Sequence, residues 1–338
     1  METITIPMVD DFHLHLRQGD MAKQVAPMVA EGGVDRCVVM PNTTPMITTT
    51  EQAMAYRSEL QSVAPETELL MTLYLHSDLT VDEIEKAAKN AVFGVKCYPR
   101  GVTTNSASGV EDLSAYAHIF EAMQKIGLPL LIHGEVPSNS SLDICIMNAE
   151  EKFLPELERL HSKFPGLRIV LEHATTRAAI ECVKGLGENV AATITLHHLE
   201  LTIDDWVVNP HNYCKPVAKY PHDRDAIRAI VSSGHPRFFF GSDSAPHPQD
   251  TKEKIPSRAG VFTTPILLPA LADCFDRLGC LDKLKDFTST FGAQFHRLPP
   301  TDKTLTLARE EWIVPKIYGQ VVPLFAGKKL NWKIVEKS

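Results

Sequence analysis

The chain has 338 residues, of which 44% are hydrophobic and 22% charged, a composition typical of a globular protein with enough apolar side chains for a large core. Its formal net charge of -8 argues against a nucleic-acid partner, because phosphate binding needs clustered Lys and Arg. The sequence shows no apolar run of about 18 residues and no leader-like N-terminus, so we expect no membrane partner and a cytoplasmic location.

The cysteines are scattered and odd in number, with no C-x-x-C pair among them. This pattern predicts reduced thiols that lie mostly in the core rather than a disulfide framework. The seven positions are Cys37, Cys97, Cys145, Cys182, Cys214, Cys274 and Cys280.

Short β-branched or apolar runs recur along the chain, and each is followed by a stretch with helical periodicity. The predicted strands span residues 3–9, 36–40, 68–75, 92–98, 129–133, 168–172, 189–195 and 237–241. The predicted helices between them span residues 21–31, 50–63, 81–90, 111–125, 150–163, 176–185 and 224–233. Parallel strands that alternate with helices in this number predict an α/β fold, the (β/α)8 TIM barrel.

Beyond residue 243 the pattern changes to a proline-rich loop, two further helical stretches over 265–276 and 282–291, and a tail with β character. That character is carried by residues 312–314 and 320–324. Because no linker or internal repeat divides the chain, we expect one domain. Residues 1–300 would form the barrel, and residues 301–338 a short C-terminal extension packed on it.

Polar side chains gather where the predicted strands end, which is where TIM barrels place their chemistry. His13 and His15 form an H-x-H pair after the first run, and a period of two puts them on one face with Arg17. A lone histidine on a strand is usually a core or surface residue. Two imidazoles on one face, in contrast, can converge on a metal ion at about 2.0 Å, so the pair favours a metal site.

Later strands end in further residues of the same kind, namely Lys96, His133, His173 and Asp243. Considered alone, Lys96 is best interpreted as a side chain that reaches the surface or pairs with a carboxylate, because an unpaired buried ammonium is costly. The joint arrangement of these residues on one rim favours a metal centre instead. His197 and His198 follow the seventh predicted strand and are left without a role.

The segments that hold these residues resemble the amidohydrolase superfamily and, within it, the type II dihydroorotases. The segments are residues 11–17 (DFHLHLR), 40–45 (MPNTTP), 94–99 (GVKCYP), 103–106 (TTNS), 132–135 (IHGE), 171–173 (LEH) and 241–247 (GSDSAPH). They run from about residue 10 to about residue 260. Their combination is specific, although the H-x-H pair alone is shared by many relatives.

The resemblance implies a cyclic amidohydrolase that interconverts N-carbamoyl-L-aspartate and L-dihydroorotate in pyrimidine (UMP) biosynthesis. It implies two zinc ions per subunit, one held by His13, His15 and Asp243 and the other by His133 and His173. Lys96, carboxylated on its side-chain nitrogen to N6-carboxylysine, would bridge the ions together with a hydroxide, since a carbamate carries the negative charge that two dications need. Histidine and carboxylate ligands also accept cobalt or manganese.

The resemblance also assigns a catalytic role and a set of substrate contacts. Asp243 would transfer the proton between the attacking hydroxide and the ring nitrogen. The substrate contacts would be Arg17, Asn42 and His247 on the carboxylate, Thr103 and Thr104 in a closing loop, and main-chain groups near Lys215, Ala259 and Gly260 on the ring edge. A guanidinium fork suits a planar carboxylate. Bacterial relatives carry an apolar residue in place of Lys215, so its contact is expected through the backbone.

Two other interpretations stay open at this point. A dihydropyrimidinase or allantoinase would share the metal ligands but would have no need of Arg17 and His247 to hold a carboxylate. A catalytically silent scaffold, known among relatives that assist a transcarbamoylase, would keep the fold without the chemistry, but the metal-site positions are intact. The family resemblance further implies a small-molecule substrate and a homodimer.

Overall fold

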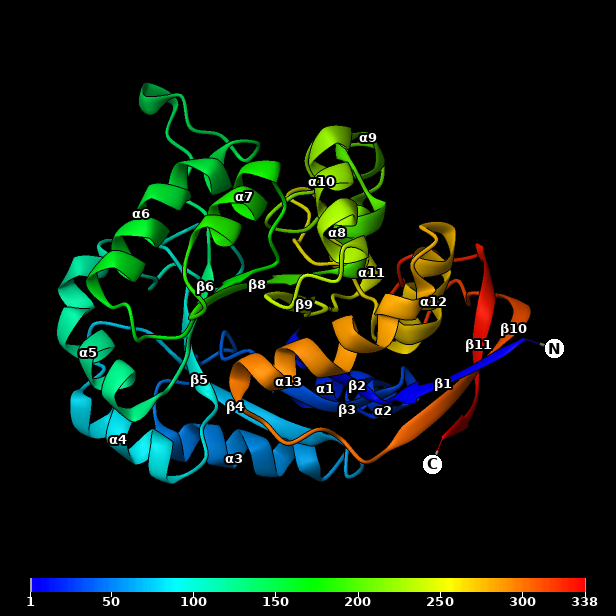
Figure 1. The fold of residues 1–338 in the computed structure, drawn as a ribbon, viewed down its shortest axis with the longest axis horizontal. Coiled ribbons are helices and arrows are strands. Elements are labelled where there is room, and N and C mark those ends of the chain that lie inside the picture. The colour runs from blue at the N-terminus through cyan, green and yellow to red at the C-terminus, as the bar shows by residue number, and fades with distance from the viewer. Residues whose placement is uncertain (1, 338) are drawn as a thin grey trace.

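The computed structural model describes residues 2–337 and contains a barrel of parallel strands surrounded by helices (Figure 1). Its eight strands pair in chain order from β2 to β9, each parallel to the next. An isolated parallel bridge between Leu14 and Ser244 joins the end of the last strand to the first. The predicted (β/α)8 TIM barrel is therefore confirmed.

The barrel strands lie close to the predicted runs and are almost wholly buried. They are β2 (Val9–Leu14), β3 (Val34–Val39), β4 (Glu68–Tyr74), β5 (Gly94–Cys97), β6 (Leu130–His133), β7 (Ile169–Glu172), β8 (Val190–Ile194) and β9 (Phe238–Phe240). Strands covered on both faces need apolar side chains at nearly every position, which explains why their sequences show little alternation.

Helices follow most strands as predicted, but the single helix predicted over residues 21–31 is divided in two at Ala26. The principal ones are α1 (Gly19–Val25), α2 (Pro27–Glu31), α3 (Thr50–Gln61), α4 (Val81–Lys89), α5 (Ala117–Ile126), α6 (Ala149–Lys163), α7 (Arg177–Gly185), α8 (Leu196–Glu200), α10 (Pro221–Ser232), α12 (Leu267–Arg277) and α13 (Phe291–His296). Threonine caps fix several starts: the side chains of Thr49, Thr80 and Thr176 each accept a backbone N–H in the first turn. The stretch predicted as one helix over 111–125 begins as the 3-10 turn η1 (Leu113–Tyr116).

A separate antiparallel sheet lies at one side of the barrel, where both chain ends are found (Figure 1). It consists of β1 (Thr3–Pro7), β10 (Thr304–Ile313) and β11 (Lys329–Lys337) in the order β1-β10-β11. The prediction of one barrel strand over residues 3–9 is therefore wrong. The partly exposed β1 pairs with the tail, and the buried barrel strand begins only at Val9.

The tail differs from its prediction in a second respect. Residues 320–324 form no strand; they contribute only a single bridge, between Tyr318 and Val321. The second strand of the tail is β11, which was not predicted because its sequence is rich in lysine and only weakly alternating. The indole of Trp332 in β11 is fully buried, so the tail packs against the barrel by its own apolar anchor.

Apolar side chains fill one end of the barrel interior and leave the other end to polar groups. Phe12, Val38, Leu131, Val170 and Phe239 belong to this internal cluster, and the rings of Phe12 and Phe239 meet edge to face with centroids 5.2 Å apart. A larger core lies between the strands and the helices. The polar side chains therefore gather at the carboxyl ends of the strands, as expected for this fold.

Within residues 2–337, no helix has both the length and the apolar composition needed to cross a bilayer. All seven cysteines are free thiols, and five of them are buried, which confirms the prediction of reduced core cysteines.

Candidate active site

His13, His15 and Asp243 bring three ligand atoms together at the barrel rim. His13 lies in β2, His15 directly follows it, and Asp243 follows β9. The Nε2 atoms of His13 and His15 are 3.3 Å apart, and Oδ1 of Asp243 lies 3.3 Å from the first and 3.1 Å from the second. A tetrahedral zinc ion with bonds of about 2.0 Å spaces its ligands at about 3.3 Å. The three atoms thus fit one face of such a coordination sphere.

The protonation states of these groups also suit a metal. Burial lowers the pKa of His13 and of His15, so both imidazoles are neutral and keep a lone pair. Burial alone would raise the pKa of Asp243, but its close contacts with His13 and His15 lower it below its usual range, so the carboxylate is ionised. A neutral imidazole and an ionised carboxylate are the forms that bind metals.

The ring of His15 is oriented by Asn42. Nδ1 of His15 lies 2.9 Å from Oδ1 of Asn42, and the amide nitrogen of Asn42 donates to the carbonyl of Thr104 at 3.2 Å. Because the amide oxygen can only accept, Nδ1 carries the proton and Nε2 is left free to bind a cation. Asn42 therefore connects the loop that holds Thr104 to the histidine pair.

Lys96 lies at the end of β5 and is fully buried. Its Nζ is paired with the carboxylate of Glu172, the last residue of β7, and lies 4.9 Å from the centre of the Tyr98 ring. Burial lowers the pKa of Lys96 to about 7. A neutral amine is therefore accessible near neutral pH, although the ammonium form has a partner in this structure.

His133 and His173 form the other half of the rim, with ring centroids 4.7 Å apart. Nε2 of His133 lies 2.8 Å from a carboxylate oxygen of Glu135, which holds the ring by that nitrogen. Lys219 stands 3.7 Å from the other oxygen of Glu135. Nδ1 of His173 has no hydrogen-bond partner among the described residues. A carboxylate behind an imidazole is the usual support of a metal-bound histidine.

Arg17 and His247 lie at the outer side of this rim. The Arg17 side chain donates from Nε to the carbonyl of Pro246 at 3.0 Å, and its Nη2 lies 3.1 Å from Nε2 of His247. That same nitrogen of His247 is 3.0 Å from the carbonyl of Ala259. These contacts use only the Nε and Nη2 edge of the Arg17 guanidinium, so its remaining N–H donors are left for a ligand.

These groups line one small cavity of about 20 Å³. The cavity is lined by His13, His15, Arg17, Asn42, Tyr98, Thr103, Thr104, His133, His173, Lys215, Asp243, Ala245, Ala259 and Gly260. Of the candidate residues from the sequence, only Lys96 and His247 are absent from the lining. Lys96 is fully buried behind it, and His247 contacts Arg17.

Comparison with known proteins agrees with this geometry. Residues 69–253 match the family model described as Amidohydrolase. The chain is 46% identical to the dihydroorotase of Mycosarcoma maydis, with 99% of each chain covered, and 44% identical to that of Saccharomyces cerevisiae, with 99% and 98% covered. The chain belongs to the dihydroorotase family of amidohydrolases. A solved dihydroorotase from Saccharomyces cerevisiae, in complex with 5-fluoroorotic acid, superimposes with a TM-score of 0.95 at 43% identity and 99% coverage of both chains.

Three side chains of this dihydroorotase site were missed in the sequence. The carboxylate of Glu172 pairs with Lys96. One of its oxygens also lies 3.0 Å from Nδ1 of His13, although the geometry of the two groups does not form a hydrogen bond. Glu135 supports a histidine, and Tyr98 lines the cavity. The signal for Glu172 and Glu135 was their position within two residues of a strand-end histidine, in segments otherwise apolar.

Positive φ angles explain why simple alternation fails at the site of this family member. His173 has a φ of +46° and Asp243 a φ of +45°. The left-handed turn at His173 breaks the period of two, so Glu172 and His173 both reach the inside of the barrel. Non-glycine residues in this region cost of order 1 to 3 kcal/mol and are concentrated at functional sites.

Proposed function

We propose that this chain is a dihydroorotase, which catalyses the reversible cyclisation of N-carbamoyl-L-aspartate to L-dihydroorotate in pyrimidine biosynthesis. The observation that carries the proposal is one cavity in which metal-type ligands and a guanidinium lie side by side. A cyclic amide with a carboxylate needs both. The full-length match to relatives named dihydroorotase supports the same activity.

The residues fit a pair of divalent cations, and we propose two zinc ions per subunit. His13, His15 and Asp243 would hold one ion, and His133 and His173 the other. Bound ions of this kind polarise an amide carbonyl and make water a competent nucleophile at neutral pH. The support is the ligand spacing of 3.1 to 3.3 Å in the first group and the orphaned ring nitrogen of His173 in the second.

Lys96 would bridge the two ions after carboxylation of its amine to N6-carboxylysine. Its complete burial favours the neutral amine that reacts with carbon dioxide, and no cationic group could stay between two dications. Carboxylation would convert the ion pair of Lys96 with Glu172 into two adjacent anions, so Glu172 would have to turn toward His13, whose Nδ1 already lies 3.0 Å away. Glu172 would then orient His13.

Arg17 would bind the carboxylate of the substrate through the donors not used by Pro246, with Asn42 and His247 beside it. The relative solved with 5-fluoroorotic acid, a carboxylated pyrimidine, supports this assignment. Backbone groups near Lys215, Ala259 and Gly260 would contact the ring edge, because these residues line the same cavity. Thr103 and Thr104 would close over the bound substrate and exclude water.

Asp243 would act as the catalytic acid and base. In ring opening its carboxylate would accept the proton of the attacking water and deliver it to the departing ring nitrogen; cyclisation reverses both transfers. Its lowered pKa keeps the carboxylate ionised at neutral pH. Its place against the histidine pair puts the carboxylate at the floor of the cavity, where the amide would lie.

A dihydropyrimidinase or hydantoinase is the nearest alternative. The dihydropyrimidinase of Brevibacillus agri superimposes with a TM-score of 0.82 but at 14% identity, which shows the shared fold alone. An inactive dihydroorotase-like domain of Chaetomium thermophilum matches at 16% identity with a TM-score of 0.69. The intact set of strand-end ligands in this chain favours an active enzyme over such a scaffold.

The family resemblance extends to features that the geometry does not address. We propose a homodimer in the cytoplasm, and a single domain in which residues 301–338 extend the barrel of residues 1–300. Light scattering of the purified protein would give the mass of the assembly.

Turnover of a substrate panel tests the proposed function. Purified, metal-loaded protein should open the ring of L-dihydroorotate far faster than that of dihydrouracil or allantoin, because only the first presents a carboxylate to Arg17. Preferential turnover of dihydrouracil or allantoin would assign the chain to another cyclic amidohydrolase. No turnover of any of them, with metal bound, would favour the scaffold.

A further inference from the structure

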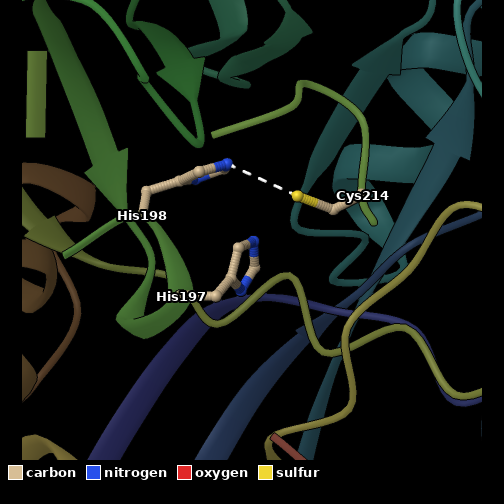
Figure 2. Close-up of side chains that lie close together, drawn as sticks. All are labelled: His197, His198 and Cys214. Atoms are coloured by element: carbon tan, nitrogen blue, oxygen red, sulfur yellow. Dashed lines mark hydrogen bonds between the residues drawn. The ribbon is translucent and has the colours of Figure 1, made fainter. Parts of the chain in front are cut away.

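A second cluster of potential ligands lies next to the active site and shares no residue with it. His197 and His198 belong to α8, and Cys214 follows the turn η3 (Pro210–Asn212). Figure 2 shows the two rings and the thiol turned toward one another. One donor atom of each lies within 4.8 Å of the others, and the three residues are at most 1% exposed.

His197 carries the clearest sign of an absent partner. Neither of its ring nitrogens has a hydrogen-bond partner within residues 2–337, and the residue is 0% exposed. Leaving a buried polar group without a partner costs about 1 to 3 kcal/mol, and native proteins rarely accept that cost. A partner from outside the chain would remove the penalty.

His198 is oriented as a ligand would be. Its Nδ1 lies 2.9 Å from the hydroxyl of Thr195, which also caps α8 by accepting the backbone N–H of His198 at 3.0 Å. Nε2 donates to the carbonyl oxygen of Pro216, 3.0 Å away, and lies 3.6 Å from Sγ of Cys214. To bind a cation through Nε2, the ring would carry its proton on Nδ1 instead, with the Thr195 hydroxyl as acceptor. Fixing one imidazole nitrogen so that the other faces a cation is the usual arrangement behind metal-bound histidines.

We propose that His197, His198 and Cys214 bind a further transition-metal ion of the zinc class. Two imidazoles and a thiolate suit zinc or cobalt and do not suit magnesium or calcium, which prefer oxygen. The thiol would lose its proton to solvent on binding. The carbonyl of Pro216, 3.1 Å from Sγ, or a water molecule would complete four-fold coordination.

The ion would join two segments that border the catalytic cavity. It would tie α8, which begins directly after β8, to the loop that carries Lys215, and Lys215 lines the cavity. Its role would be to fix that loop, so we assign the three ligands a positioning function. The inference does not rest on the proposed catalytic activity.

Cobalt provides a selective probe, because the proposed catalytic ligands contain no sulfur. Full-length protein stripped by a chelator under reducing conditions and titrated with Co2+ should develop a near-ultraviolet thiolate-to-cobalt charge-transfer band. Its amplitude at saturation should correspond to one thiolate-bound cobalt per chain. The band should be absent in Cys214→Ser and strongly weakened in His197→Gln. Zinc-loaded samples of both variants should contain one ion fewer per chain than the parent.

Cys274→Ser is the matched control, because Cys274 is also buried but belongs to no group of potential ligands among the described residues. This control should keep the band and the full metal content. Circular dichroism shows whether each variant is folded. If Cys214→Ser does not fold, the band and metal content of His197→Gln test the proposal instead. No thiolate band in the parent protein, or a band in His197→Gln or Cys214→Ser as strong as in the parent, would overturn the proposal whatever the activity of the enzyme.

Discussion

Each histidine pair of the active site contains a ring whose outer nitrogen is already held by another side chain. Asn42 holds His15 at 2.9 Å, and Glu135 holds His133 at 2.8 Å. A fixed ring loses little rotational entropy when it binds a cation, so such contacts raise metal affinity. The residues behind the histidines therefore matter to the site almost as much as the histidines.

Replacement of Arg17 by alanine should weaken binding of the carboxylated substrate. A lost hydrogen bond to a charged group is worth about 1.5 to 3 kcal/mol, so KM for L-dihydroorotate should rise roughly 10- to 150-fold, with a smaller effect on kcat. Steady-state kinetics would show this. Arg100→Ala is the control, because Arg100 is exposed and pairs only with Glu111. An unchanged KM in Arg17→Ala would refute the carboxylate contact.

Replacement of Asp243 by asparagine should remove proton transfer while preserving volume. We expect kcat to fall by about 10²- to 10⁴-fold, the range of general acid-base contributions. Metal analysis of the same sample should show that at least one ion remains, because His133 and His173 are untouched. A kcat within a few-fold of the parent value would exclude Asp243 as the proton carrier.

The strand-end residues could be predicted because each belongs to a local pattern. His13 and His15 stand out as an H-x-H pair, and Asp243 follows a wholly apolar strand. Glu172 lies two residues after the inward Val170, so alternation places it inside the barrel, whereas the inward direction of His173 depends on its own positive φ. Contacts made by backbone irregularity leave no periodic trace in the sequence.

At the scale of elements, the loop after β9 is organised by one buried ammonium. Lys252 ends the short helix α11 (Gln249–Lys252), and its Nζ donates to the carbonyls of Tyr213, Arg258 and Gly260 at 2.8 to 2.9 Å. These carbonyls flank the segments expected to contact the substrate ring. Lys252 therefore holds two loops of the cavity in register.

Replacement of Lys252 by methionine should leave those carbonyls without donors. We expect the free energy of unfolding to fall by about 2 to 4 kcal/mol and KM to rise, since an unsatisfied buried group costs about 1 to 3 kcal/mol. Thermal unfolding and kinetics would measure the two effects. Lys254→Met serves as control, because Lys254 is exposed and pairs only with Asp250. Equal behaviour of the two variants would contradict the proposed role of Lys252.

The barrel strands and helices could be predicted nearly to their ends, because apolar runs and helical periodicity are local signals. The three-stranded sheet could not. The sequence of residues 3–7 is typical of the start of a barrel strand. Only their pairing with Thr304–Ala308 shows that they belong to the antiparallel sheet and not to the barrel. Pairing across such a sequence distance is not encoded in either segment alone.

At the scale of the whole molecule, the N-terminal and C-terminal strands belong to the same antiparallel sheet. β1 and β11 flank β10, and β11 packs its one indole inward. Trp332 is fully buried, its Nε1 lies 3.3 Å from Asp276 in α12, and Arg309 stacks over its ring at 4.6 Å. The tail thereby links the last strand to a helix of the barrel.

Replacement of Trp332 by alanine should destabilise the protein by about 3 to 5 kcal/mol, because truncation of a buried aromatic leaves a cavity. Well below the unfolding temperature, kcat should stay near the parent value. Val335→Ala on the same strand, where the side chain is 48% exposed, should change stability by no more than about 0.5 kcal/mol. A stable Trp332→Ala protein would show that the tail is not anchored by this residue.

The buried Lys96 would join two cations into one catalytic centre. The most direct test of this bridge is metal content and L-dihydroorotate turnover measured on the same samples of the parent protein and Lys96→Ala. We predict two catalytic ions per chain, besides the ion proposed at His197, His198 and Cys214, and rapid ring opening in the parent. The variant should lose the two catalytic ions and turnover. A Lys96→Ala protein that keeps its metal and its activity would contradict the account.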